Sequence, residues 1–397
     1  MAGDDVRRCC RKARSELSDP VSEGLERIRA WGEARDWRGY DPYDALNSPV
    51  AGVLSLGTTL GRRLFTQAVK LSPLNLRPLV GIRPDWNAKA IALVASGYVR
   101  LARAGDDSAR RHAQRWLGWL ADHPSTEGGG WGYHFPVQTR VFAYPRGAPN
   151  TIATSFVAQS FLDAWELLGD EPAGRHALDA CDFLVSRMRT GGARPYFRYL
   201  PGENELVHNA NVLACAVLAR AARLSGSRDL FDPARAAVET TLAAQRPDGS
   251  WPYADADGHD WVDNFHTAYV LDGLVECARF LPDLGEPIDL GVRFWERELF
   301  LADGTPKYFQ DRALPVDAHC YATAIDTWLS LTWRRPDALE RAERLAFLLV
   351  DGMLDRRGFV HFQRRRLWTS RVPLVRWTTA PSFRALAGVL SVRAERG

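Results

Sequence analysis

The sequence predicts an all-α fold, an (α/α)6 toroid in which six helical hairpins close into a ring. The first observation is a repeat, because six times along the chain a polar residue opens an apolar helical run. The second observation is the spacing of about 54 to 63 residues, which fits two helices and their turns. The six openings are Asn87, Asn150, Asn209, Asp263, Asp317 and Thr378.

Amphipathic segments between these runs are the third observation, and they predict an outer layer of helices. The inner runs are richer in Ala, Ser and Thr, as expected where helices crowd around an axis. We expect residues 1–20 to be a flexible or helical segment, followed by one toroid domain at residues 21–397 that begins with a helical and loop extension. The outer helices are expected at residues 21–37, 110–122, 173–188, 229–244, 285–301 and 336–353.

Composition narrows the class of protein. The 397 residues are 46% hydrophobic and 25% charged, which are ordinary globular values. A net charge of +3 spread over this length does not indicate a nucleic-acid partner. Six cysteines show no disulfide spacing, and neither a signal-like segment nor an apolar window of 18 residues is found. We therefore expect a cytoplasmic protein with no transmembrane segment.

Polar residues at the starts of the inner runs should converge, because parallel inner helices bring their N-termini to one mouth of the ring. About half of these residues are expected to be plain N-caps, which Asn, Asp and Thr favour. Histidine is not a favoured cap, yet three histidines recur at this level. The set is Asn87, Lys89, Asn150, Thr151, His208, Asn209, Asn211, Asp263, Asn264, His266, Asp317 and His319.

Two loops add candidates. The N-terminal loop carries Tyr40, Asp44 and Arg77 among prolines. Asp44 fits either a turn or the site, and Arg77 fits either a buried clamp or an anion-binding wall. The aromatic loop at residues 125–150, with Trp131, Tyr133 and Arg140, is long for a connection and indicates a folded rim over the mouth.

The segment Gln245–Trp251 has the form Q-x-x-D-G-S-W, with a glycine for the turn and a tryptophan to pack over it. It resembles the QW repeat of the terpenoid cyclase and protein prenyltransferase toroids, which implies their ring fold. The acid motif of a class II cyclase has no match here. Segments around His266, Asp317 and Cys320 resemble zinc-ligand segments of the prenyltransferases only faintly, in reversed order. They leave zinc at these three residues as a minor alternative to no cofactor.

A closer resemblance is to uncharacterised toroid proteins encoded among exopolysaccharide genes. It implies a role in polysaccharide biosynthesis, without an established reaction, and leaves polysaccharide-assembly proteins open as partners. The similar segments are residues 39–44, 72–77, 131–133, 149–150, 208–211, 261–267, 306–308 and 315–319.

Acid–base chemistry on a glycan or lipid-linked oligosaccharide is the function that these residues favour, because imidazole titrates near neutral pH. Glycoside cleavage would use Asp263 and Asp317 as its carboxylate pair. An epimerase or lyase would use a histidine base with Arg77, Arg140 or Lys89. A non-catalytic glycan-binding scaffold and a terpenoid or prenyl-group enzyme stay as alternatives.

The expected catalytic residues are Asp263, His266, Asp317 and His319. The expected binding residues are Tyr40, Asp44, Arg77, Asn87, Lys89, Trp131, Tyr133, Arg140, Asn150, His208, Asn209, Asn264 and Tyr308.

Overall fold

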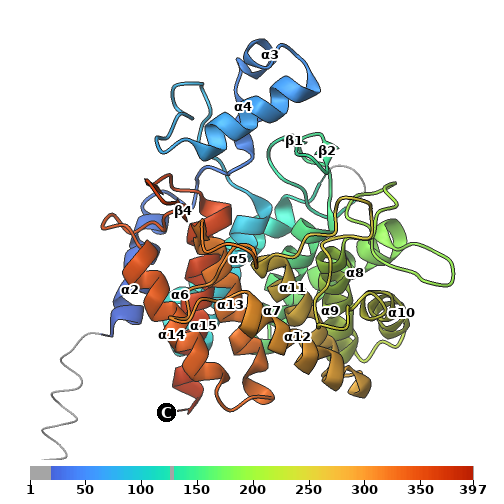
Figure 1. The fold of residues 1–397 in the computed structure, drawn as a ribbon. Coiled ribbons are helices and arrows are strands. Elements are labelled where there is room, and N and C mark those ends of the chain that lie inside the picture. The colour runs from blue at the N-terminus through green and yellow to red at the C-terminus, as the bar shows by residue number, and fades with distance from the viewer. Residues whose placement is uncertain (1–18, 126–128, 397) are drawn as a thin grey trace, which may run out of the picture.

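Six helices form an inner ring in the computed structural model, which describes residues 19–125 and 129–396 (Figure 1). Each helix packs against the next one along the chain, and the last packs against the first, so the ring closes. The inner helices are α5 (Ala88–Arg103), α7 (Thr151–Leu168), α9 (His208–Ser225), α11 (Asn264–Cys277), α13 (Ala318–Ser330) and α15 (Ala380–Arg396).

An outer layer of helices covers this ring, and each outer helix packs mainly against one inner partner. The outer helices are α2 (Pro20–Glu33), α6 (Asp107–Asp122), α8 (Glu171–Phe183), α10 (Phe231–Leu242), α12 (Gly285–Glu298) and α14 (Ala338–Met353). The predicted (α/α)6 toroid is therefore confirmed. The expected segment at residues 1–20 falls mostly outside the described residues, and α2 begins at Pro20 behind its N-cap, Asp19.

Burial separates the two layers. Thirteen of the sixteen residues of α5 are buried, whereas α6, of equal length, buries five. An inner helix packs on all sides, so small residues allow close approach, while an outer helix buries only one stripe. None of the helices in residues 19–125 and 129–396 is long and apolar enough to cross a membrane.

Four of the six predicted starts of the inner helices are confirmed by their caps. Asn87 and Asn150 accept backbone N–H bonds from the first turns of α5 and α7, and Asp263 and Asp317 do the same for α11 and α13. Helix α9 lacks a side-chain cap. The sixth opening differs, because a π-helical turn, η5 (Val375–Thr379), precedes α15.

Short elements surround the end of the ring where the inner helices begin. Strands β1 (Val137–Gln138) and β2 (Ala143–Tyr144) form an antiparallel hairpin inside the aromatic loop. Strands β3 (Val316–Asp317), β4 (Gln363–Arg364) and β5 (Thr369–Ser370) form an antiparallel sheet in that order. The N-terminal extension holds η1 (Asp44–Asn47), α3 (Ala51–Leu54) and α4 (Thr59–Leu71), and α3 and α4 stand away from the ring (Figure 1). Short turns complete the fold: η2 (Leu184–Met188), η3 (Pro282–Leu284) and η4 (Leu331–Trp333).

The Q-x-x-D-G-S-W turn joins outer helix to outer helix. Gln245 Nε2 donates to the carbonyl of Pro287 in the first turn of α12 at 2.9 Å. Trp251 Nε1 donates to the carbonyl of Thr241 in α10 at 3.1 Å. Gly249 has a φ of 97°, which favours glycine. The turn therefore connects the end of α10 to the start of α12.

Gly273 tests the close packing of the inner ring. A Cβ at this position of α11 would lie 2.8 Å from the backbone oxygen of Val212 in α9, and backbone cannot rotate away. We expect Gly273→Ala to lower the free energy of unfolding, because overpacking of about 1–3 kcal/mol exceeds the roughly 1 kcal/mol gained in helix propensity. Gly118→Ala on α6 is the control, since no atom lies within 4 Å of its Cβ and only the gain remains. Urea unfolding measures both, and equal effects would contradict the packing argument.

Candidate functional site

A cavity of about 790 Å³ lies where the inner helices begin. Its walls are mostly aromatic and charged, with only four aliphatic residues. Such a volume suits a small ligand or one to a few sugar residues. The lining is Tyr43, Lys89, Tyr133, Phe135, Val137, Thr139, Arg140, Val141, Phe142, Tyr144, Ile152, Tyr199, Asn209, Arg246, Tyr253, Asp260, Trp261, Val262, Asp263, Phe265, His266, Tyr269, Tyr308, Phe309, Gln310, Asp311, Arg312, His319, Arg376 and Trp377.

An aspartate and a histidine pair at the start of α11. Asp263 Oδ1 accepts the backbone N–H of His266 at 3.0 Å, and its Oδ2 lies 2.6 Å from His266 Nδ1. Trp261 Nε1 also donates to Oδ2, at 3.2 Å. An ionised carboxylate only accepts, so Nδ1 carries the proton, and Nε2 is the ring nitrogen that Asp263 does not engage. His266 is 23% exposed and lines the cavity, so its imidazole is oriented and accessible.

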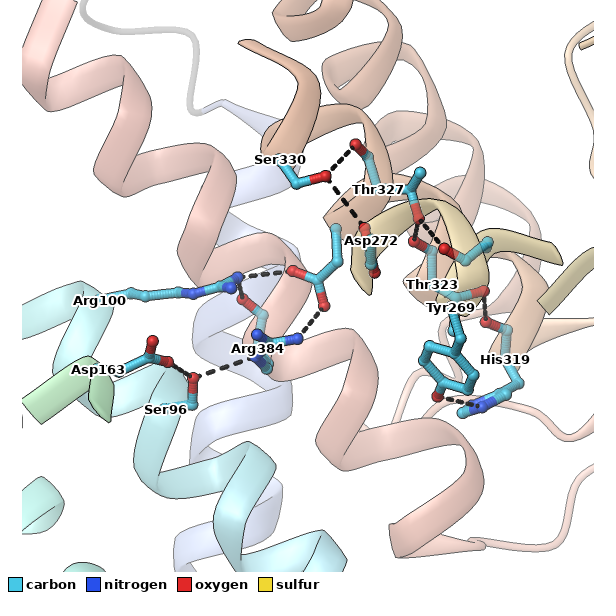
Figure 2. A network of polar contacts seen from close by, with 12 residues as sticks. Ser96, Arg100, Asp163, Tyr269, Asp272, His319, Thr323, Thr327, Ser330 and Arg384 are labelled. Carbon is cyan, nitrogen blue, oxygen red and sulfur yellow. Dashed lines mark hydrogen bonds and ion pairs between the residues drawn. The ribbon is translucent and has the colours of Figure 1, made fainter. Parts of the chain in front are cut away.

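His319 belongs to a second polar chain in the cavity wall. Its Nδ1 donates to the carbonyl of Trp377 at 2.8 Å, so its Nε2 accepts from the hydroxyl of Tyr269, also at 2.8 Å (Figure 2). The ring stacks on Trp377 at 4.6 Å between centroids. Burial, reinforced by the charge of Lys89, lowers the pKa of His319 well below its ordinary value. The imidazole is therefore neutral and fixed in one tautomer.

Lys89 projects from the first turn of α5 into the same wall. Its Nζ lies 3.3 Å from the hydroxyl of Tyr269 and 4.1 Å from the centre of the Phe156 ring. Burial, followed by repulsion from Arg376, lowers its pKa well below the ordinary value. The partners of this amine are a phenol and aromatic faces rather than a carboxylate, which is an unusual setting for a buried lysine.

Arg376 enters the cavity from η5. It donates to both carboxylate oxygens of Asp41, and its guanidinium lies over the ring of Tyr133 at 4.7 Å. Behind it, Arg77 donates to the carbonyl of Asp41 and to Asp44 at 2.8 Å. Burial raises the pKa of Asp44 to about 6. Arg77 is therefore the buried clamp that holds the loop under Arg376, not part of the cavity wall.

Eight of the seventeen predicted site residues line the cavity, and nine do not. Those in the lining are Lys89, Tyr133, Arg140, Asn209, Asp263, His266, Tyr308 and His319. Those outside the lining are Tyr40, Asp44, Arg77, Asn87, Trp131, Asn150, His208, Asn264 and Asp317.

The residues outside the lining have structural partners. Asn87 and Asn150 cap helices, and Trp131 Nε1 donates to the carbonyl of Leu120. Asn264 bonds the carbonyl of Leu299 and Trp295 Nε1, and Tyr40 lies under the guanidinium of Arg77. His208 is fully buried between Thr241 and Asp255, at 3.3 and 2.8 Å. Each of these side chains makes a contact within the fold, and among the described residues one nitrogen of the set, Asn150 Nδ2, is buried without a partner.

Asp317 also has its side chain engaged within the fold, which distinguishes it from Asp263. Its Oδ1 accepts from the backbone of His319 and from Trp377 Nε1, at 2.8 and 3.1 Å. Its Oδ2 accepts from Gln363 Nε2 at 2.7 Å. The residue has no exposed surface, and burial raises its pKa to about 6. It supports the wall from behind.

The zinc alternative is wrong. Over the described residues, no group of three or more His, Cys, Asp or Glu side chains is placed to hold a metal ion, so His266, Asp317 and Cys320 do not form one. Burial also raises the pKa of the Cys320 thiol well above its ordinary value, and thiolate is the zinc ligand.

Sequence reasoning missed Arg376 and Trp377, together with tyrosines 43, 199, 253 and 269. Arg376 and Trp377 immediately precede Thr378, the predicted sixth opening, so extending that opening by one helical turn would have found them. Tyr253 stacks on Trp261 with 4.5 Å between ring centres, and Tyr199 stacks on Phe142 at 4.1 Å. These flat faces come from loops between helices.

Ionic side chains fill the ring below the cavity. Arg384 donates to Asp326 at 2.8 Å and to Ser96 at 3.1 Å, and Arg100 donates to Asp326 at 2.6 Å (Figure 2). Ser96 in turn contacts Asp163. The cavity therefore opens at the end where the inner helices begin and is backed by a polar network at the other.

The fold is shared with solved structures of glycan-acting enzymes. A GH76 α-mannanase of Bacteroides thetaiotaomicron has a TM-score of 0.64 at 11% identity, over 78% of this chain and 88% of that chain. An unsaturated glucuronyl hydrolase specific for heparin has a TM-score of 0.61 at 15% identity, over 81% and 90%. A cellobiose 2-epimerase from Bacillus thermoamylovorans has a TM-score of 0.61 at 11% identity, over 78% and 88%.

These likenesses define the class of fold, an α/α toroid. No protein-family model matches the chain, and neither does a curated protein sequence.

Asp317→Asn tests the buried carboxyl. Folding raises the pKa of Asp317 from 3.8 to about 6. Between these pH values the Asp317 carboxyl is therefore protonated in the folded protein and ionised in the unfolded chain. The stabilisation from this proton is complete below about pH 4 and is lost as pH rises through 6. Asparagine does not titrate, so the stability of the variant relative to wild type should rise by about 2–3 kcal/mol from pH 4 to pH 7. Urea unfolding at both values measures this, and a constant difference would rule it out.

Proposed function

We propose that this protein is an enzyme of polysaccharide biosynthesis that acts on an anionic glycan by histidine acid–base chemistry of the epimerase or lyase type. The observation that carries the proposal is the pairing of Asp263 with His266 in an aromatic cavity, which orients one imidazole and leaves Nε2 for substrate. The glycan-acting toroids of similar fold and the resemblance to exopolysaccharide-cluster proteins support it.

An anionic sugar suits the charges of the cavity. Five basic side chains and three carboxylates line it, and one carboxylate, Asp263, is committed to His266. Lys89 and Arg376 are buried in the lining, as His319 is. The stacked pair of Tyr253 and Trp261 offers a flat face to a sugar ring.

Asn209 supplies a further contact. It lines the cavity, and its Oδ1 is buried without a hydrogen-bond partner among the described residues. A buried acceptor that is left unpaired costs free energy, and a sugar hydroxyl would satisfy it.

The reaction uses the groups in the following way. His266 Nε2 takes the proton from the sugar carbon next to a carboxylate, and the electron pair of that C–H bond moves into the carboxylate. Lys89 and Arg376 stabilise the added negative charge. Return of a proton to the opposite face gives the epimer. The hydroxyl of Tyr269, which donates to His319 before substrate binds, turns to give this proton and is left as a phenolate beside Lys89. Solvent water then carries the proton of His266 back to this phenolate. Cleavage of the neighbouring glycosidic C–O bond instead, with the same hydroxyl protonating the departing oxygen, gives the unsaturated lyase product.

Hydrolysis fits the geometry less well. A glycosidase needs two carboxylates flanking one bond, and the expected partner of Asp263 was Asp317. Asp317 is buried behind the wall with both oxygens occupied. The remaining carboxylates of the lining, Asp260 and Asp311, are exposed. A terpenoid reaction is also less suited, because Lys89 and Arg376 would repel a carbocation.

Solvent exchange tests the proposal. We expect the protein to catalyse deuterium incorporation at the carbon next to the carboxylate when it is incubated with uronic-acid oligosaccharides in D₂O, observed by NMR. His266→Gln and Asp263→Asn should slow the exchange by about 10²- to 10⁴-fold, since they remove or misorient the base. His361→Gln is the matched control, because His361 pairs with Asp355 at 3.0 Å outside the cavity. Incorporation of ¹⁸O from water without deuterium would indicate a hydrolase, and binding without either would indicate a scaffold.

Lys89→Met separates stability from binding. The substitution keeps a straight side chain but removes a buried amine, so we expect the free energy of unfolding to rise by about 1–3 kcal/mol. We expect the affinity for uronic-acid oligosaccharides to fall at least tenfold, because a cation near the sugar carboxylate is lost. Urea unfolding and calorimetric titration measure the two effects. A variant that is less stable, or that binds as tightly as wild type, would remove Lys89 from the proposed site.

A further inference from the structure

Exposed aliphatic side chains are concentrated in one short stretch of the chain. Over the described residues fourteen large hydrophobic side chains are exposed, and nine of them fall between Val50 and Leu79. Exposure on this scale indicates a surface that another body covers. The nine residues, here called the leucine face, are Val50, Val53, Leu54, Leu56, Leu60, Leu64, Leu71, Leu74 and Leu79.

Helix α4 carries two apolar faces. Val69 and Thr66 are buried on the side that packs against the protein. Leu60, Leu64 and Leu71 are 66%, 61% and 38% exposed, and their spacing places them in one narrow stripe on the other side. The outer stripe contributes nothing to the packing of α4 onto the ring, so its leucines need another explanation.

Leu56 lies in the turn between α3 and α4, and its side chain points into solvent. It has a φ of 51°, a left-handed conformation that leucine rarely adopts, and it is 85% exposed. Gly57 follows with a φ of 65°. A turn that presents leucine rather than glycine or asparagine at this point is strained without any gain in packing.

The surrounding charge is of one sign. No Asp or Glu occurs between Asp44 and Asp85, while Arg62, Arg63, Lys70, Arg77 and Arg83 do. Arg77 is paired with Asp44, and Lys70 donates to the hydroxyl of Tyr43. Arg62 and Arg83, which lie in the same segment of the chain, are exposed. A surface of leucines and arginines without carboxylates complements lipid phosphates above acyl chains.

We infer that the leucine face docks this protein on an anionic lipid bilayer, with the leucines among the upper acyl chains and the basic side chains of the same segment attracted to the phosphates. A protein partner is the less suitable occupant, because protein interfaces are enriched in aromatic residues and all nine members of this face are aliphatic.

The docked orientation brings the cavity to the membrane. Helix α4 packs against β1 and η1, and Val137 of β1 and Tyr43, next to η1, line the cavity. Figure 1 shows α3 and α4 standing beyond the end of the ring, beyond the β1–β2 hairpin. A lipid-linked glycan could then enter without leaving the bilayer surface, a step that rests on the proposed function, whereas docking itself does not.

Vesicle sedimentation of the full chain tests the docking. We expect wild type to sediment with vesicles of equal phosphatidylglycerol and phosphatidylethanolamine, and to stay in the supernatant with phosphatidylcholine alone. The variant with Leu56→Ser, Leu60→Ser, Leu64→Ser and Leu79→Ser should bind at least tenfold more weakly, with an unchanged unfolding midpoint because these side chains are exposed. Arg62→Glu with Arg83→Glu should also weaken binding and remove its dependence on salt. Phe347→Ser, on outer helix α14, is the control and should bind as wild type.

Three outcomes would overturn the inference: wild type that does not sediment with the anionic vesicles, a leucine variant that sediments unchanged, or light scattering that shows a dimer dissociated by the leucine variant without vesicle binding. The last would assign the face to a second copy of the chain. Deuterium exchange on a soluble oligosaccharide is measured separately, so loss of docking with retained exchange refutes only the membrane inference, and the reverse result refutes only the proposed function.

Discussion

The packing of α15 against α5 is the contact on which the rest of the structure depends, because it closes the ring. It requires close approach, since a Cβ at Gly97 of α5 would lie 2.6 Å from the ring of Phe383 in α15. Once the ring is closed, parallel inner helices must begin around one axis. Residues from the first turn of a helix, far apart in sequence, then share one cavity. Lys89, His266 and His319 meet in this way.

Every helix that begins there has backbone N–H groups to satisfy, and this requirement shapes the site. Asp263 and Asp317 both give one carboxylate oxygen to that task. They differ in the second oxygen, which holds His266 in one case and Gln363 in the other. The same local solution to helix capping therefore yields an oriented base at α11 and a buried support at α13. Whether the aspartate orients a base or supports the wall depends on which side chain contacts its second oxygen.

Local sequence patterns predict that both aspartates cap helices, but they do not predict the partner of the second oxygen, and the same limit applies to the rest of the site. The period of the openings predicts the toroid and the starts of its inner helices, because both follow from local patterns. The same patterns do not distinguish His208 from His266, since burial between Thr241 and Asp255 depends on residues about 33 and 47 positions away. Arg376 was not predicted because it lies in a π-helical turn that precedes α15 in place of a capped helix start. The aromatic loops supplied Tyr133 correctly, whereas the position of Tyr199 depends on how two loops fold together.

The distribution of charge along the axis gives the strongest argument for the kind of ligand. Below the cavity, Arg100 and Arg384 share Asp326, and Arg220 pairs with Asp163 at 2.7 Å. At this level the protein supplies its own counter-charges. In the cavity Asp41 supplies a counter-charge for Arg376, whereas the contacts of Lys89 among the described residues are with a phenol and aromatic faces. A buried amine in that setting is costly unless an anion joins it, because desolvation disfavours its charge. Under the proposed function, a sugar carboxylate would restore the charge of Lys89 and would be attached to the carbon that His266 deprotonates, so binding and proton transfer would depend on the same group of the substrate.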